Sequence, residues 1–182
     1  PVLSVGEAGA FDRRWVIDPC VIKVGNEFRL YYTGYNGSLW QTGLATSSDG
    51  IKWTKYPGNP ILAVVPSTWE SIVCAAPRVY YDGSSYKMLY TGYDGNSHNI
   101  GHATSTDGIH WTRYASNPVL RKGDPGSWDQ VGIQGSSFVV HNGRIFLFYC
   151  ATGGPTGFAV STDWITWTKY SAQAWESLRS HT

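Results

Sequence analysis

The fold is indicated by residues 43–54, which read GLATSSDGIKWT. The block returns at residues 101–112 as GHATSTDGIHWT and at residues 157–168 as GFAVSTDWITWT. In the first two copies an Asp-Gly pair joins two short runs of alternating apolar and polar residues, which is a strong signal for a β-hairpin. The chain therefore carries one hairpin-forming segment three times.

A second block precedes each hairpin segment. It reads VIKVGNEFRLYYTG at residues 21–34, VYYDGSSYKMLYTG at residues 79–92 and, more loosely, FVVHNGRIFLFY at residues 138–149. The equivalent tyrosines Tyr32, Tyr90 and Tyr149 are 58 and 59 residues apart. Each copy adds two β-branched and aromatic runs joined at a glycine, so each unit is expected to form four antiparallel strands, as in one blade of a β-propeller.

We therefore expect an all-β chain, a β-propeller of four-stranded antiparallel blades with three blades in 182 residues. The repeats divide one propeller-type domain, residues 1–182, into blades of about 1–58, 59–116 and 117–171. Residues 172–182 are either a tail, with one turn of helix at 172–178, or the start of a fourth repeat.

Composition excludes several classes of partner. The net charge is +1 and only 15% of residues are charged, which leaves no basic footprint for nucleic acid and no polybasic membrane surface. No apolar run approaches the roughly 20 residues of a membrane span. The N-terminal residues do not form a signal peptide, yet a removed signal stays open, so the localisation is unknown, with secreted or periplasmic as options.

Cofactor and metal sites are not expected. The three cysteines, Cys20, Cys74 and Cys150, stand in no Cys-x-x-Cys pair, and no histidine pairs with another at ligand spacing. We interpret the cysteines as small buried apolar residues and disfavour a Cys20–Cys74 disulfide.

The aspartates of the hairpin segments, Asp49, Asp107 and Asp163, recur in every unit. An aspartate at such a turn accepts backbone N–H bonds, and the tryptophan that follows it packs between blades. We predict that these aspartates are structural and lie in outer hairpin turns.

The sequence resembles the five-bladed β-propeller glycosidases, the superfamily of arabinanases, β-xylosidases, invertases and mannoside-phosphorylase-like enzymes. The resemblance is carried by residues 18–21 (DPCV) leading into residues 31–34 (YYTG), by residues 76–80 (APRVY), and by the hairpin segment followed by residues 59–62 (NPIL). It implies that the innermost strand of each blade lines a central funnel and starts with the catalytic acids. Cleavage of a glycoside needs two carboxyl groups that flank the bond.

By this resemblance Asp18 matches the base or nucleophile. It also breaks the repeat of this chain, in which the equivalents are Ala76 and Gly135, so we predict that it faces the funnel. The alternative is that Asp18 caps the turn before Pro19. Glu70 is the remaining candidate for the general acid, although acids recur at its position in every unit, which favours a structural role.

Other residues are expected to bind substrate. Arg78 and Gln134 stand where relatives carry acids, and an arginine at the first place helps bind an anion in mannoside-phosphorylase-like relatives. The funnel mouth offers four aromatic platforms for sugar faces, each of which could instead serve packing: Trp15, Tyr35, Trp40 and Tyr93.

The leading hypothesis for function is a carbohydrate-active propeller that binds or hydrolyses glycosides in a central funnel, with weak or no activity in this chain. The alternative is a non-catalytic glycan-binding, protein-binding or structural module. Three blades leave two apolar faces uncovered, so we expect self-association to a homodimer that completes a propeller.

Overall fold

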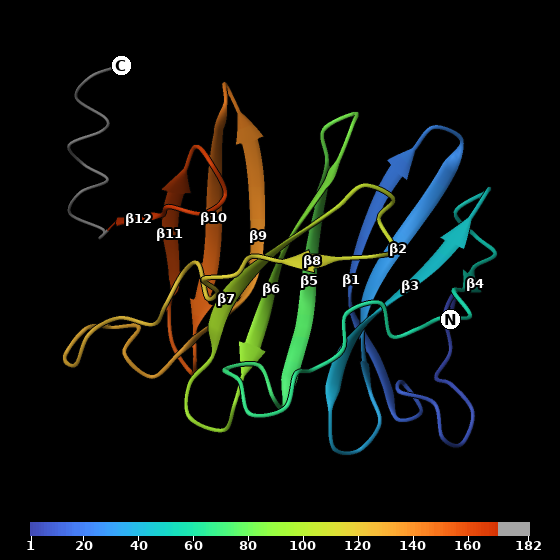
Figure 1. Ribbon diagram of the computed structural model, residues 1–182, viewed down its shortest axis with the longest axis horizontal. Coiled ribbons are helices and arrows are strands. Elements are labelled where there is room, and N and C mark those ends of the chain that lie inside the picture. The colour runs from blue at the N-terminus through green and yellow to red at the C-terminus, as the bar shows by residue number, and fades with distance from the viewer. Residues whose placement is uncertain (171–182) are drawn as a thin grey trace.

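The structure is a computed structural model that describes residues 1–170, and its strands fall into three consecutive sets of four (Figure 1). The first set is β1 (Trp15–Val24), β2 (Glu27–Tyr35), β3 (Trp40–Ser47) and β4 (Thr54–Lys55). The second is β5 (Val73–Tyr81), β6 (Tyr86–Tyr93), β7 (Asn99–Ser105) and β8 (Thr112–Arg113). The third is β9 (Ile133–His141), β10 (Arg144–Ala151), β11 (Thr156–Ser161) and β12 (Thr168–Tyr170). The all-β class is confirmed, and the expected tail or fourth repeat at 172–182 lies outside the described residues.

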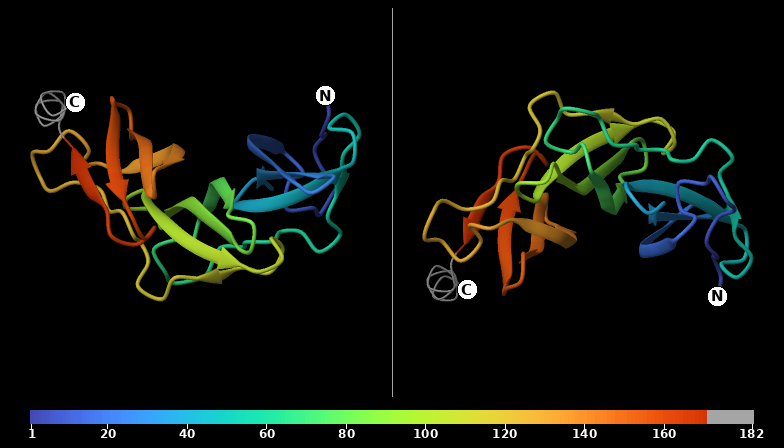
Figure 2. Two further views of the ribbon diagram at one scale, coloured as in Figure 1. Left: turned by 90° about the horizontal axis from the view of Figure 1, so that it is seen from above. Right: turned by 90° about the horizontal axis from the view of Figure 1, so that it is seen from below.

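Strands pair antiparallel in chain order within each set, as hairpin connections require. The first two sets touch through one parallel pair, Trp40 with Val73, and the third set forms its own sheet. Figure 2 shows the three sets following one another along an arc, with β1, β5 and β9 toward its concave side. These three strands also contact one another in sequence, β1 with β5 and β5 with β9.

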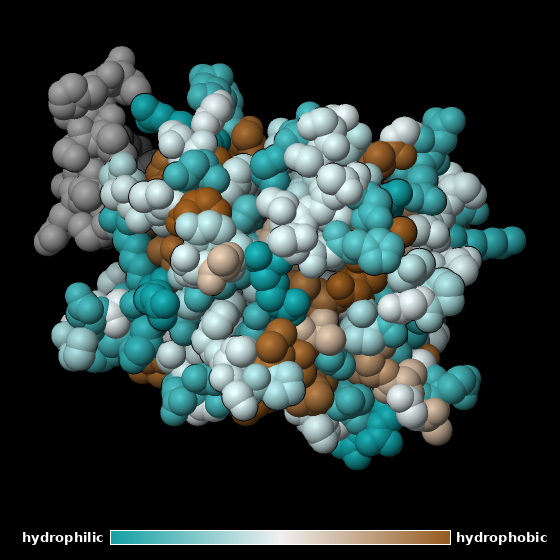
Figure 3. Space-filling view, viewed as in Figure 1, coloured by the Kyte–Doolittle hydropathy of each residue, from teal (hydrophilic) through white to brown (hydrophobic). Residues whose placement is uncertain are grey.

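Apolar cores lie between neighbouring sets, because each sheet buries a face against the next. Tyr31 and Leu44 from the first set pack with Met88 and Tyr90 from the second. A second cluster joins the second and third sets and includes Leu89, Ile100, Ile133 and Leu147. The face seen in Figure 3, crossed by β8, is mostly polar, with apolar residues in separate patches.

The predicted aspartate turns occur where the hairpin segments place them. Oδ1 of Asp49 accepts hydrogen bonds from the amides of Ile51 and Lys52, both at 2.8 Å, and the Ser47 hydroxyl donates to the same oxygen at 3.0 Å. Asp107 and Asp163 have the same pattern of contacts. These donors lower the pKa of Asp163 to about 2, first of all through the Thr166 amide. The turns are therefore built by local hydrogen bonds to a carboxylate.

A buried acid ties the start of each set to its outermost strand. Oδ2 of Asp12 accepts from the Tyr32 hydroxyl at 2.9 Å and from Nζ of Lys55 at 2.6 Å. The third set repeats this arrangement with Asp129, Tyr149 and Lys169, at 3.3 and 2.6 Å. These acids are almost fully buried, and a buried carboxylate is tolerated when it is paired and hydrogen-bonded.

Glu70 occupies this same position in the second set. Its Oε1 accepts a hydrogen bond from Nε of Arg113 at 2.8 Å, its Oε2 accepts from the Cys74 thiol at 3.4 Å, and its side chain is only 4% exposed. The carboxylate is thus committed to a buried ion pair. The buried ion pair favours the structural role that the recurrence of acids at this position suggests, and the assignment of Glu70 as general acid stays a prediction.

The cysteines are free thiols. Cys74 is buried and Cys20 half-buried, and burial raises the pKa of both. Cys150 is exposed on β10, so the prediction of a buried residue is wrong there, because β10 belongs to the last described set and one of its faces has no neighbouring sheet. Across residues 1–170, no helix is long and apolar enough to cross a membrane.

Candidate functional site

The innermost strands share one backbone irregularity. The pairing of β1 with β2 shifts between Ile17 and Cys20, and the pairing of β5 with β6 shifts between Ala75 and Arg78. The β9–β10 pairing shifts at the equivalent place. One residue inside each shift has a left-handed backbone: φ is 52° at Asp18, 51° at Ala76 and 50° at Gly135.

Positive φ is costly for aspartate and for alanine, and such strain gathers at functional sites. A bulge also redirects the side chain of the extra residue. The three left-handed residues all line one cleft of about 480 Å³. The three innermost strands therefore share the same bulge with a left-handed residue, and all three of these residues line the same cleft.

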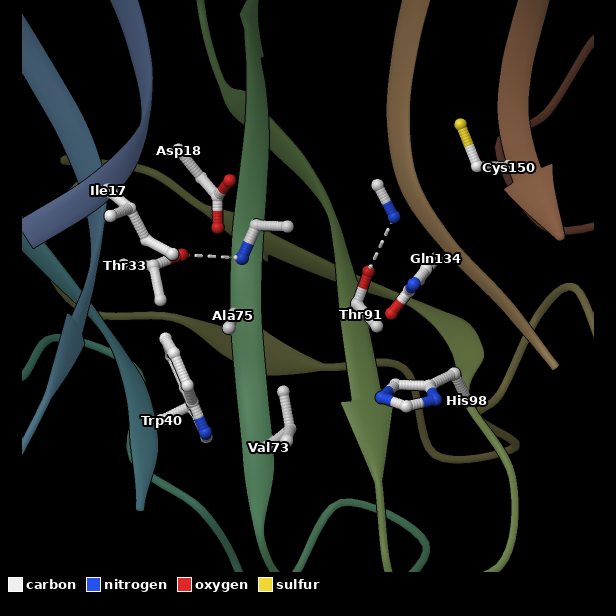
Figure 4. Close-up of a pocket in the computed structure, with 12 residues that line it drawn as sticks. Ile17, Asp18, Thr33, Trp40, Val73, Ala75, Thr91, His98, Gln134 and Cys150 are labelled. Atoms are coloured by element: carbon white, nitrogen blue, oxygen red, sulfur yellow. Dashed lines mark hydrogen bonds between the residues drawn. The ribbon is translucent and has the colours of Figure 1, made fainter. Parts of the chain in front are cut away.

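The cleft draws its walls from all three sets of strands. Its volume is within the range of ordinary small-molecule sites. In Figure 4, Asp18 lies on one side, beside β5, while Gln134 and His98 lie on the other side, beyond β6. Trp40 and Val73 line the end of the cleft below Asp18.

The cleft contains little charge. Among its described lining residues, Asp18 has the single carboxylate, and no lysine or arginine is present. Burial lowers the pKa of His98 below its ordinary value, so its imidazole is neutral at pH 7. Within residues 1–170, no group of three or more acidic, histidine or cysteine side chains is placed to hold a metal ion. The arrangement suits an uncharged ligand rich in hydroxyl groups.

The predicted aromatic residues gather at two places around the cleft. Tyr35 stacks on Trp40 with ring centroids 4.2 Å apart, and Trp15, 52% exposed, lies 5.2 Å from Trp40. On the other side Tyr93 stacks on His98 at 4.1 Å. Trp40 and His98 thus form part of the cleft wall, and Tyr35 and Tyr93 support them from behind.

Arg78 does not line the cleft. It is half-buried on β5, and its Nη1 donates to the Pro77 carbonyl at 2.8 Å. Its charge acts on the Cys20 thiol, where it opposes the larger effect of burial on the pKa. Of the predicted site residues, the structure therefore brings Asp18, Trp40 and Gln134 together, and leaves Arg78 and Glu70 apart.

Sequence reasoning did not identify four polar side chains that line the cleft: Thr33, Thr91, His98 and Cys150. Thr33 and Thr91 belong to the repeated Tyr-Thr-Gly motif, which was interpreted only as part of a strand. Both threonines recur near a strand end at the funnel, and this recurrence could have identified them as residues that line the cleft. His98 stands in a loop before β7 and carries no comparable signal.

A family model described as β-1,4-mannooligosaccharide phosphorylase matches residues 39–180. The chain belongs to glycoside hydrolase family 130. The expected relation to five-bladed β-propeller glycosidases is confirmed, with this chain as a partial match.

Curated relatives of this family 130 chain include an uncharacterized protein of Mycobacterium tuberculosis, 28% identical over 92% of this chain and 58% of the relative. A β-1,2-mannobiose phosphorylase of a Thermoanaerobacter species is 27% identical over 52% of this chain and 35% of its own length.

Among solved structures, one from work on family 130 hydrolases that target β-1,2 mannosidic linkages in Candida mannan matches with a TM-score of 0.73 and 21% identity. The match covers 57% of the chain in that structure and 96% of this chain. A family 117 glycoside hydrolase of Zobellia galactanivorans matches with a TM-score of 0.71 and 18% identity, over 87% of this chain and 56% of its own length. These likenesses show the fold, and the family 130 chain spans less than two thirds of the proteins it resembles.

Proposed function

We propose that the cleft binds an uncharged β-mannoside, and that the chain by itself turns such a sugar over slowly or not at all. The observation that carries the proposal is the cleft of about 480 Å³ that Asp18, Gln134 and Trp40 line together. Family membership supports the sugar class, because the family model and the matched relatives are described by mannosides or mannosidic linkages.

Each of these side chains has a distinct role in the proposal. A sugar ring has apolar C–H faces and a rim of hydroxyl groups, so it needs a flat aromatic surface and convergent hydrogen-bonding groups. Trp40, held by its stack with Tyr35, provides the surface. Asp18 accepts hydrogen bonds from sugar hydroxyls, and the Gln134 amide both donates and accepts.

The same lining argues against efficient cleavage. Glycoside hydrolysis uses an acid that protonates the leaving group and a second carboxylate that acts as base or nucleophile. Asp18 can fill the second role, but the described lining of the cleft holds no further carboxylate. Glu70, the other candidate, is paired with Arg113 away from the cleft. This favours the non-catalytic glycan-binding alternative for the chain alone.

The test is isothermal titration calorimetry with β-1,2-mannobiose and β-1,4-mannobiose, with cellobiose as a non-mannoside control. We expect at least one of the two mannobioses to bind. Both Asp18→Asn and Trp40→Ala should weaken this binding at least about tenfold, since each removes a direct contact. Asp124→Asn is the matched control, because Asp124 is exposed in the loop before β9 and does not line the cleft. Absence of binding to either mannobiose, or equal losses in Asp124→Asn, would refute the proposal.

A further inference from the structure

Two threonines stand at equivalent positions on the floor of the cleft, Thr33 on β2 and Thr91 on β6. The oxygen of each hydroxyl accepts a hydrogen bond from the left-handed residue of the following set. The Ala76 amide donates to Oγ1 of Thr33 at 2.8 Å, and the Gly135 amide donates to Oγ1 of Thr91 at 3.2 Å (Figure 4). The hydroxyl oxygens are therefore fixed by backbone groups of a neighbouring sheet.

A threonine hydroxyl has two acceptor lone pairs and one proton to donate. The incoming amide occupies a lone pair and leaves the proton free. In the part of the chain that the structure describes, no protein acceptor receives a hydrogen bond from either hydroxyl. Thr42, a buried threonine on β3 outside the cleft, differs, because its hydroxyl donates to the Cys74 carbonyl at 3.0 Å.

The residues next to these hydroxyls are small. Ala76 carries only a methyl group, and Gly135 carries no side chain. A Cβ atom built on Gly135 would meet nothing within 4 Å, so the space above this residue is open. A ring-shaped ligand can thus approach the backbone beside Thr91, and Thr33, which is buried as Thr91 is, lines the same cleft.

We propose that the hydroxyls of Thr33 and Thr91 each donate a hydrogen bond to an oxygen of the bound saccharide, while Asp18 accepts from another of its hydroxyl groups. The inference rests on the proposed function and adds two specificity-determining residues to it. Two oriented donors and one carboxylate acceptor match a neutral polyol, because every hydroxyl of a sugar can serve either role. An anionic ligand would lie against the Asp18 carboxylate and would be repelled.

The third set of strands lacks this donor. Cys150 replaces threonine at the equivalent position on β10, and a thiol is a weak hydrogen-bond donor. The predicted polar contacts therefore concentrate on the part of the cleft between β1 and β9, around Ala76 and Gly135.

The experiment compares Thr33→Val, Thr91→Val, Thr33→Ser and Thr91→Ser by calorimetric titration with whichever of β-1,2- and β-1,4-mannobiose the wild-type chain binds. Loss of one neutral hydrogen bond should weaken binding about three- to tenfold in each valine variant. The serine variants keep the hydroxyl and should bind within about twofold of wild type. Thr42→Val is the matched control, since it removes a buried threonine hydroxyl away from the cleft and should reduce thermal stability while leaving affinity unchanged.

Singly deoxygenated methyl mannosides supply a readout that does not depend on a valine variant folding. Removal of either hydroxyl that faces a threonine should cost the wild-type and serine proteins about three- to tenfold in affinity, and a folded valine variant should no longer distinguish its matching analogue from the parent sugar. Wild-type affinity in both valine variants, or an equal loss in Thr42→Val, would overturn this inference and leave the proposed function standing. Failure of the wild-type chain to bind either mannobiose would refute both.

Discussion

Removal of the Glu70 carboxylate tests whether this residue is structural or catalytic. The Glu70 side chain is 4% exposed and that of Arg113 is 27% exposed, with 2.8 Å between Nε and Oε1. Breaking a buried ion pair by removing one partner costs about 3–5 kcal/mol. Because Arg113 is partly solvated and also donates to the Ala63 carbonyl, we expect a loss near the lower end for Glu70→Gln, about 3 kcal/mol.

The expected loss corresponds to a fall of about 6–12 °C in the melting temperature for a chain of this size, measured by circular dichroism. Glu27→Gln is the matched control. Glu27 pairs with Arg29 at the same distance of 2.8 Å, but the Glu27 side chain is 46% exposed. A partly exposed pair contributes less than about 1 kcal/mol, so the control should melt within about 3 °C of wild type.

Two results would contradict the structural assignment of Glu70. One is a melting temperature for Glu70→Gln that equals the control. The other is a mannobiose affinity or turnover that falls while the melting temperature stays unchanged, which is the behaviour expected of a group that contacts substrate.

Three further predictions concern pH, packing and assembly. His102 is buried against Trp164, and burial lowers its pKa to about 4, so the unfolded state binds the extra proton and stability should fall as pH drops from about 6.5 to 4. This loss should be smaller in His102→Phe, and a pH profile of stability in that variant equal to that of the wild type would contradict the assignment. Trp164 has a left-handed backbone, with φ of 69°, and its ring packs between the second and third sets beside Tyr80 and Phe138. Trp164→Gly relieves the backbone strain but removes the ring, so it should lower the free energy of unfolding in urea by about 2–4 kcal/mol. A neutral or stabilising effect would show that the ring adds no packing energy. Val21 in the first set and Val139 and Phe148 in the third set are exposed apolar residues, so we expect the chain to self-associate through them. In sedimentation velocity Val139→Glu should weaken that association, whereas a stable wild-type monomer at micromolar concentration would exclude it.

The sequence predicted the repeated strands well because each signal is local. The Asp-Gly pairs at residues 49–50 and 107–108 specify hairpin turns, and the recurring Tyr-Thr-Gly motifs mark the strands that precede them. Asp18 was singled out because it departs from the repeat. That rule depends on comparing equivalent positions within one chain, and it needs no knowledge of the tertiary structure.

The remainder of the site could not be predicted because it depends on contacts between sets of strands. Thr33 reaches the amide of Ala76, which lies 43 residues further along the chain, and only the packed sheets bring the two together. Arg78 follows a bulge that changes which face of β5 its side chain takes, so a motif match did not place it in the cleft. His98 enters the cleft from a loop whose path no periodic pattern specifies.

The most direct test of the proposed site is a crystal structure of the chain soaked with the mannobiose that it binds. We expect a sugar ring over Ala76 and Gly135, with a hydroxyl group within about 3 Å of the Asp18 carboxylate and a ring face against Trp40. A sugar bound on the outer face crossed by β8, or one in the cleft without contact to Asp18 or Trp40, would contradict it.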